Sequence, residues 1–248
     1  DLIRPDTTLV SVMAVNNEIG SIQPIQAISE LLADKPTISF HVDAVQALAK
    51  IPTEKYLTER VDFATFSGHK FHGVRGVGFV YIKSGKKITP LLTGGGQERD
   101  YRSTTENVAG IAATAKALRL SMEKLDIFTS NTGQMKAVIR QALLDYPDIF
   151  VFSDEEDFAP HILTFGIKGV RGEVIVHAFE DYDIFISTTS ACSSKAGKPA
   201  GTLIAMGVDK DKAQSAVRLS LDLENDMSQV EQFLTKLKLI YNQTRKVR

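Results

Sequence analysis

Short runs of apolar and β-branched residues alternate with amphipathic stretches along the first half of the chain. The runs predict strands at residues 8–15, 37–42, 61–66 and 76–83. The amphipathic stretches predict helices at residues 25–35, which Pro24 opens, 46–49 and 109–125. This alternation predicts a mainly parallel sheet, and the short connection into residues 76–83 predicts that the last strand is antiparallel to its neighbour.

The second half continues the alternation with shorter elements. Its predicted strands lie at residues 149–152, 161–165, 183–188 and 217–221. Its predicted helices lie at residues 132–144, 172–180, 204–206, 210–216 and 227–248. We therefore expect two domains, residues 1–125 and 126–248, of which the second is a smaller α+β domain.

The composition is that of a globular protein with balanced charge. The 248 residues are 43% hydrophobic and 24% charged, and the formal net charge is −1. This balance gives no reason to expect nucleic acid or an anionic membrane as a partner. A single cysteine leaves no internal disulfide framework, so we expect a reducing, cytoplasmic location. The chain opens without Met and enters a strand at once, as if cut from a longer protein.

Lys70 follows the predicted strand at residues 61–66 and closes the motif Ser67-Gly68-His69-Lys70. A neutral lysine amine is a nucleophile that forms Schiff bases with carbonyl cofactors. Ser67 and His69 on the same turn could hold a phosphate. The alternative is an ordinary solvated lysine after a strand.

Asp43 and Gln46 lie in HVDAVQ, directly after the predicted strand at residues 37–42. A carboxylate paired with a pyridine nitrogen keeps that nitrogen protonated, and Gln46 could bond a ring hydroxyl. The alternative for Asp43 is a helix N-cap. Asn17 also follows a predicted strand, although Asn-Asn is ordinary turn chemistry there. Since ligands bind at the carboxyl ends of parallel strands, we expect Asn17, Asp43 and Lys70 at that edge.

Two further stretches have chemistry suited to anions. A triple-Gly loop at residues 94–96 precedes Arg99, Arg102 and three hydroxyl residues at 103–105, a set of donors that suits an anion, although such a loop is also often only a turn. Arg218, on the predicted strand at residues 217–221, could bind a substrate carboxylate through two hydrogen bonds. A structural ion pair remains open for Arg218.

Cys192 lies among small and polar residues at 189–197. This setting predicts an exposed, mobile thiol rather than a buried structural cysteine, which is the alternative. The thiolate is the nucleophilic form, and a nearby lysine such as Lys195 favours it.

Together, the motifs AVNNEIG, HVDAVQ, FSGHK, GGGQER with RSTT, and SACSS resemble the pyridoxal-phosphate-dependent cysteine desulfurases of the NifS-like type. These belong to the class V aminotransferase family, of fold type I, and the resemblance covers essentially the whole chain. It implies an α/β fold. Residues 1–125 would then be the C-terminal part of a large, mainly parallel seven-stranded domain, and residues 126–248 a small α+β domain that carries the cysteine loop.

The resemblance also implies a role for each site residue. Lys70 would bind pyridoxal 5'-phosphate covalently, and Asp43 would bind the ring nitrogen. Gln46 and Asn17 would bind the ring hydroxyl, and Ser67 and His69 would bind the phosphate. Thr105 would reach the phosphate held by a partner subunit. Arg218, with Asn17, would bind the substrate carboxylate. RSTT departs from the family's RSGT, and Thr104 has less backbone freedom than glycine.

The activity that the resemblance implies is conversion of L-cysteine to L-alanine, with the sulfur passed to Cys192 as a persulfide. An acceptor protein would then take the sulfur, for iron–sulfur cluster assembly or tRNA thiolation, and the enzyme would be a homodimer. Family members are longer, and the difference lies before Asp1, so we expect an N-terminal portion of the same enzyme to be needed. Three alternatives stay open: another class V aminotransferase or lyase, a selenocysteine lyase, and a non-catalytic fragment.

Overall fold

The chain divides into two compact units, and one short segment near the N-terminus belongs to the second unit. The computed structural model describes residues 2–154, 156–189 and 201–246. Residues 1–14 and 23–125 form the first unit, and residues 15–22 and 126–248 form the second. The segment 15–22 follows the first strand in sequence and was predicted to lie with residues 1–125, but it packs within the second unit.

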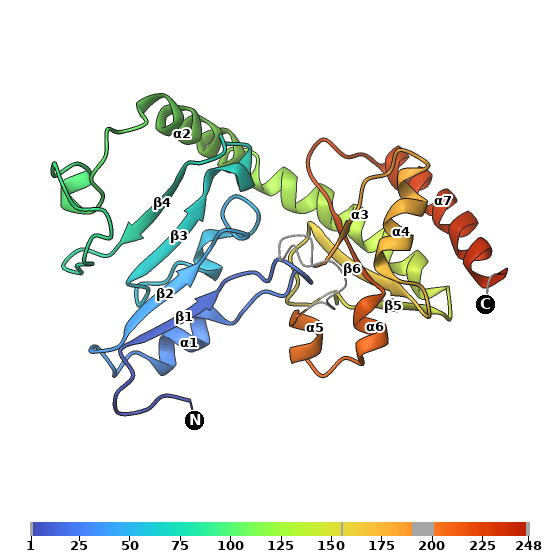
Figure 1. The fold of residues 1–248 in the computed structure, drawn as a ribbon, viewed down its shortest axis with the longest axis horizontal. Coiled ribbons are helices and arrows are strands. Elements are labelled where there is room, and N and C mark those ends of the chain that lie inside the picture. The colour runs from blue at the N-terminus through green and yellow to red at the C-terminus, as the bar shows by residue number, and fades with distance from the viewer. Residues whose placement is uncertain (1, 155, 190–200, 247–248) are drawn as a thin grey trace. The chain divides into compact units, whose positions relative to one another are not determined.

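The first unit contains a four-stranded sheet in the order β1-β2-β3-β4 (Figure 1). The first three strands pair in parallel and β4 pairs antiparallel with β3, which confirms the predicted mainly parallel α/β arrangement. The strands are β1 (Leu9–Met13), β2 (Ser39–Asp43), β3 (Phe63–Ser67) and β4 (Gly78–Ile82). The α-helices are α1 (Ile25–Leu31) and α2 (Val108–Met122), and the 3-10 helices are η1 (Thr53–Lys55), η2 (Gly68–Phe71) and η3 (Glu98–Asp100).

Alternation along β2 gives the sheet one buried face and one accessible face. Phe40 and Val42 are fully buried, whereas His41 is half-buried and Asp43 is exposed. Strand β1 is not buried on both faces, because Leu9 is 54% exposed. Within the described sheet β1 is an edge strand, with β2 as its only neighbour.

The prediction of a helix at residues 46–49 is wrong, since consecutive turns occupy residues 45–50. The Leu48 amide donates to the Ala44 carbonyl at 3.1 Å, and the Ile51 amide to the Ala47 carbonyl at 3.0 Å. Ala49 has a φ of 58°, a left-handed conformation that a right-handed helix cannot continue.

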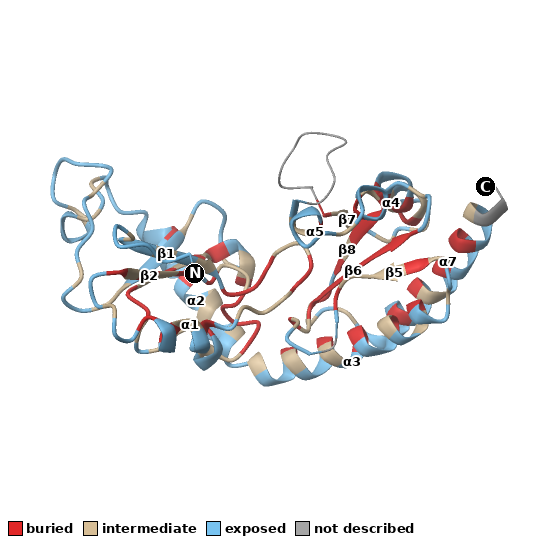
Figure 2. Ribbon diagram, turned by 90° about the horizontal axis from the view of Figure 1, so that it is seen from below, coloured by how far each residue is buried: buried red, intermediate tan, exposed pale blue. Residues whose placement is uncertain are grey.

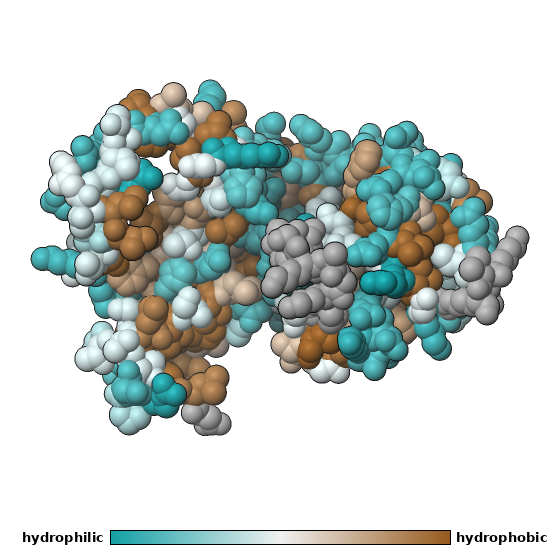
Figure 3. Space-filling view, viewed as in Figure 1, coloured by the Kyte–Doolittle hydropathy of each residue, from teal (hydrophilic) through white to brown (hydrophobic). Residues whose placement is uncertain are grey.

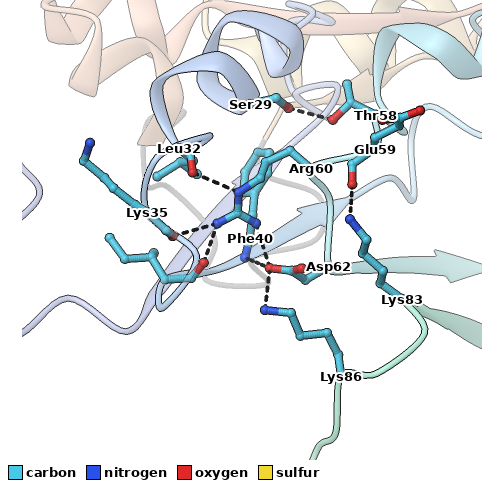
Figure 4. A network of polar contacts seen from close by, with 11 residues as sticks. Ser29, Leu32, Lys35, Phe40, Thr58, Glu59, Arg60, Asp62, Lys83 and Lys86 are labelled. Atoms are coloured by element: carbon cyan, nitrogen blue, oxygen red, sulfur yellow. Dashed lines mark hydrogen bonds and ion pairs between the residues drawn. The ribbon is translucent and has the colours of Figure 1, made fainter.

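Arg60 and Asp62, in the loop before β3, form an ion pair, and Arg60 also bonds the segment before β2 (Figure 4). The Arg60 guanidinium donates to a carboxylate oxygen of Asp62 at 2.8 Å. The same guanidinium donates to three main-chain carbonyls beyond α1, those of Leu32 at 3.0 Å, Lys35 at 3.1 Å and Ile38 at 2.5 Å. One arginine side chain therefore fixes the whole connection between α1 and β2.

Asp62 receives further partners that hold it ionised. Its carboxylate accepts the Phe40 amide at 2.9 Å and lies 3.3 Å from the Lys86 ammonium. Burial alone would raise the pKa of Asp62, but the Phe40 amide, Arg60 and Lys86 together hold that pKa below its ordinary value. The carboxylate is therefore charged at neutral pH, and its stabilising contribution is lost only when acid protonates it.

The second unit has an antiparallel sheet in the order β5-β6-β8-β7, with buried residues concentrated on β6 and β8 (Figure 2). Its strands are β5 (Ile149–Val151), β6 (Ile162–Ile167), β7 (Ser187–Thr188) and β8 (Ala216–Ser220). Its helices are α3 (Leu125–Leu144), α4 (Gly172–Glu180), α5 (Gly201–Ala205), α6 (Lys210–Gln214) and α7 (Met227–Lys246). Among the described residues, none of these helices is long and apolar enough to cross a membrane.

The core of the second unit forms where α3, α4 and α7 pack on this sheet. Every residue of β6 is buried, and the inward positions of α3 are Met135, Ile139 and Leu143. Phe179 of α4 stacks on Phe233 of α7 with ring centroids 4.9 Å apart. This α+β arrangement holds the two central strands, β6 and β8, in a fixed register.

Several element boundaries differ from the predictions, among them the end of α1, which lies at Leu31 rather than at residue 35. Two of the differences have a clear cause in the structure. The strand predicted at residues 183–188 is reduced to Ser187–Thr188, because Asp183 has a φ of 59° and the Ile184 amide bonds the Phe179 carbonyl to close α4. Helix α3 begins at Leu125 rather than at residue 132, and its first turns bury Phe128. Both differences arise from how the helix ends are closed and packed.

We predict that Asp62→Asn lowers the free energy of unfolding by about 3 kcal/mol, because Arg60 would keep its buried charge without a carboxylate partner. Chemical denaturation at neutral pH measures this loss. Asp34→Asn is the control, since the exposed Asp34 carboxylate pairs only with neighbouring Lys35 and its removal should change little. Equal losses in the two variants would contradict the assignment.

Candidate active site

The turn that carries Lys70 is rigidly packed. It forms η2 directly after β3, and the Gly68 amide donates to the Val77 carbonyl at 2.9 Å. A Cβ on Gly68 would lie 2.9 Å from that carbonyl and 2.9 Å from a methyl group of Thr114, so only glycine fits. Phe71 is buried at the other end of the turn. Lys70, half-buried, therefore extends from a fixed platform.

Ser67 and His69 meet on this same turn. The Ser67 hydroxyl and the His69 Nδ1 lie 2.9 Å apart, and His69 is exposed. A hydroxyl and an imidazole are both hydrogen-bonding groups that suit an anion. Ser67, His69 and Lys70 thus lie on one turn, as their sequence spacing predicted.

Asp43 lies at the same edge of the sheet as this turn. It is the last residue of β2 and pairs in register with Thr65 of β3, two residues before Ser67. Its Oδ1 accepts the Val45 amide at 3.0 Å, so the carboxylate closes a turn rather than capping a helix. Gln46 is half-buried in the turns that follow. Parallel pairing of β2 with β3 therefore gives the edge a carboxylate and an amine.

A row of polar side chains runs across the accessible face of the sheet beside Asp43. His41 Nδ1 lies 2.7 Å from the Ser11 hydroxyl, and its Nε2 lies 3.1 Å from the Thr65 hydroxyl. Burial lowers the pKa of His41, and the negative charge of Asp43 partly opposes that effect. His41 was not among the residues predicted for the site, although its spacing of two residues from Asp43 on a strand indicates a shared face.

Thr105 lies in a different part of the first unit, in the exposed loop between η3 and α2. This loop borders a groove of about 1150 Å³ beside β4, whose lining includes Thr104, Arg102 and Ile111. Apolar residues of β4 and α2 are exposed, and Figure 3 shows hydrophobic residues on this part of the surface. Neither Lys70 nor Asp43 lines the groove.

In the second unit, the structure brings Asn17 and Arg218 together. The Arg218 guanidinium, on β8, donates to the main-chain carbonyl of Asn17 at 2.7 Å. Asn16 shapes the turn, because its side-chain oxygen accepts the amides of Glu18 at 2.8 Å and Ile19 at 3.0 Å. The two residues predicted to bind a substrate carboxylate are thus neighbours, and Cys192 lies outside the described residues.

A buried lysine of the second unit was also missed by sequence analysis. Lys136 on α3 is 6% exposed, and its ammonium donates to the Ala159 carbonyl at 2.9 Å. Burial lowers the pKa of Lys136 to about 8. No local pattern distinguishes Lys136 from a surface lysine, because the segment that buries it, around Ala159, is remote in sequence. It provides a second amine whose reactivity can be compared with that of Lys70.

A parallel sheet with Lys70 and Asp43 at its carboxyl edge, followed by an α+β unit, defines the class of protein. The chain belongs to the class-V aminotransferase family, whose model matches residues 1–233. The family resemblance predicted from the motifs is confirmed.

Individual relatives narrow the similarity to NifS-like proteins. The chain is 51% identical over 243 residues to a "NifS/IcsS protein homolog" of Lactobacillus delbrueckii subsp. bulgaricus, covering 98% of this chain and 63% of that protein. It is 37% identical over 248 residues to "Cysteine desulfurase IscS" of Clostridium botulinum, covering 99% of this chain and 62% of that protein. A solved "NIFS-LIKE PROTEIN" superposes with a TM-score of 0.87 at 37% identity, covering 97% of this chain and 63% of that protein. The chain therefore spans less than two thirds of the length of these relatives.

We predict that Asp43→Asn lowers the pKa of His41 further, because it removes the negative charge that favours the imidazolium form. Titration of the labelled histidine rings by NMR measures this shift, with His41→Gln identifying the resonance. Asp34→Asn, at an exposed carboxylate next to Lys35, is the control and should leave the titration unchanged. An unchanged His41 titration in Asp43→Asn would show that the two side chains do not interact.

Proposed function

We propose that this protein is a pyridoxal-phosphate-dependent cysteine desulfurase that converts L-cysteine to L-alanine. The observation that carries the proposal is that Asp43, at the end of β2, and Lys70, on the turn after β3, lie at the same edge of the sheet. The packing of the Lys70 turn admits only glycine at residue 68. The Clostridium botulinum relative, named as a cysteine desulfurase, supports the same activity.

The donor set fits pyridoxal phosphate. An exposed carboxylate, a hydroxyl–imidazole pair and an amine match a ring nitrogen, a phosphate and an aldehyde, respectively. In this proposal Asp43 binds the ring nitrogen, Gln46 and Asn17 the ring hydroxyl, and Ser67 and His69 the phosphate. Thr105 would reach the phosphate of a partner subunit. When bound, the cofactor supplies an electron sink for the pair of electrons left when the substrate Cα–H bond breaks.

The remaining groups act on the substrate. The Lys70 amine accepts the α-proton and returns a proton at the end of the reaction. Arg218 and Asn17 bind the substrate carboxylate, which orients the amino acid. The Cys192 thiolate attacks the substrate sulfur, so that the sulfur–sulfur bond forms as the carbon–sulfur bond breaks. The electron pair of the broken bond stays on the substrate Cβ, which takes up a proton equivalent to the one that the Cys192 thiol lost on ionisation. Alanine leaves, and the sulfur remains on Cys192 as a persulfide.

The wider setting is part of the same proposal. The persulfide would pass its sulfur to an acceptor protein, for iron–sulfur clusters or tRNA thiolation, in the cytoplasm. We propose that the active form is a homodimer and that residues equivalent to the remainder of the longer relatives take part in it. These steps rest on similarity to the family rather than on contacts within this chain.

Lys70→Ala should abolish the absorbance band of the bound cofactor, because no other amine would replace Lys70 on the turn. An absorbance scan after incubation with pyridoxal phosphate and gel filtration measures this. Lys55→Ala, at an exposed lysine of η1, should bind as the parent does. An absorbance band that persists in Lys70→Ala would contradict the proposal that Lys70 binds the cofactor.

Cys192→Ala should lower alanine formation from L-cysteine by more than about a hundredfold while leaving cofactor absorbance intact, as expected when an enzyme nucleophile is removed. Ser193→Ala provides the matched control with normal activity. Retained activity of Cys192→Ala would favour a class V transaminase or lyase that needs no thiol. Activity on selenocysteine alone would favour a selenocysteine lyase.

A further inference from the structure

Three consecutive main-chain carbonyls in the second unit are each held by a side chain from the sheet region. Arg218 donates to the Asn17 carbonyl at 2.7 Å. The Thr164 hydroxyl donates to the Glu18 carbonyl at 2.6 Å, and the Ser153 hydroxyl to the Ile19 carbonyl at 2.5 Å. Loop carbonyls usually bond to water or to nearby backbone. Capture of three in succession therefore fixes the backbone at residues 17–19.

The sheet places these donors in line. Thr164 of β6 and Arg218 of β8 are register partners, so their side chains lie side by side on one face. The Ser153 hydroxyl also accepts the Thr164 amide at 2.9 Å, which ties the third donor to the second. Thr164 is 0% exposed and Ser153 is 1% exposed, so water cannot replace either hydroxyl.

The backbone at Gly20 holds the other end of the segment. Gly20 has a φ of +84°, and a Cβ there would lie 2.9 Å from the Cβ of Ile162, the first residue of β6. Ile19 packs in a buried cluster with Leu203 and Ala216. The conformation of residues 17–20 is therefore held at both ends, by the side-chain donors that bond its carbonyls and by the packing of Gly20 and Ile19.

We propose that Thr164 is a positioning residue for the carboxylate-binding pair. Its hydroxyl holds the Glu18 carbonyl, which sets the position of the adjoining Asn17 carbonyl, and that carbonyl in turn orients the Arg218 guanidinium. Thr164 touches no substrate in this arrangement and acts through Asn17. The inference rests on the proposed function, because it assigns the carboxylate of the amino acid to Asn17 and Arg218.

Two readouts test the inference on the protein carrying its cofactor. Thr164→Val keeps the shape of the side chain but leaves the Glu18 carbonyl without its donor. We expect the dissociation constant of L-alanine, measured by calorimetry, to rise about tenfold, as for loss of a buried hydrogen bond. Amide hydrogen exchange in residues 16–22 should become faster in the same variant. Thr164→Ser, which keeps the hydroxyl, should restore both properties.

Thr132→Val is the matched control. Thr132 is also a buried threonine of the second unit, but its hydroxyl bonds the Phe128 carbonyl within α3 at 2.6 Å. It should leave L-alanine binding unchanged even if it lowers stability, which separates positioning from a general loss of packing. Ser153→Ala provides a second variant should Thr164→Val fail to fold, and it should also weaken L-alanine binding.

The outcomes separate the inference from the proposed function. Faster exchange with weaker L-alanine binding in Thr164→Val supports the inference. Unchanged binding in Thr164→Val, while Arg218→Ala weakens binding, overturns the inference and leaves the proposed function standing. Unchanged binding in Arg218→Ala overturns the carboxylate site itself, and the inference with it.

Discussion

The geometry of the first unit depends on the hydrogen bonds and ion pairs that the Asp62 carboxylate makes. This carboxylate accepts the Phe40 amide, while the Asp62 amide donates to the Phe40 carbonyl, so a single residue links the start of β2 to the segment before β3. A slip of one residue would turn every side chain of a strand to the other face. The Asp62 contacts therefore help determine that Asp43 lies beside Thr65, two residues before Ser67 and the Lys70 turn.

The chemistry at the sheet edge depends on this register and on two tight packings. Gly68 lets the Lys70 turn approach Thr114 and Val77, and Gly20 lets the Asn17 segment approach Ile162. In each unit a glycine admits close contact, and in the second unit polar side chains also hold the main-chain carbonyls of residues 17–19. These packed segments thus position Lys70 and the Asn17 carbonyl, whereas Thr105 lies in an exposed loop and Cys192 lies outside the described residues.

Local patterns were sufficient for elements whose own residues decide their structure. The helix predicted at residues 172–180 matches α4, because its apolar positions repeat with the helical period and Ile175 and Phe179 are buried. The position of Lys70 after a strand was likewise evident from SGHK. Prediction failed at residues 46–49, where left-handed Ala49 ends the turn, and tertiary packing rather than propensity decided the outcome.

Other parts of the site depend on contacts between distant residues. The bond from Thr164 to the Glu18 carbonyl joins positions 146 residues apart, and nothing in either local sequence indicates it. The Ser11–His41–Thr65 row required the strand order and register before it could be seen. The motif NNEIG could be recognised, but the roles of Asn16, Ile19 and Gly20 became clear only from the packing of the second unit.

The central claim is that Lys70 is the amine that binds the cofactor. The most direct measurement is borohydride reduction of the protein loaded with pyridoxal phosphate, followed by peptide mass mapping. We predict that the reduced pyridoxyl group is attached to Lys70. Attachment to Lys136, whose burial lowers its pKa to about 8 and makes it the competing amine, or to no lysine, would contradict the account.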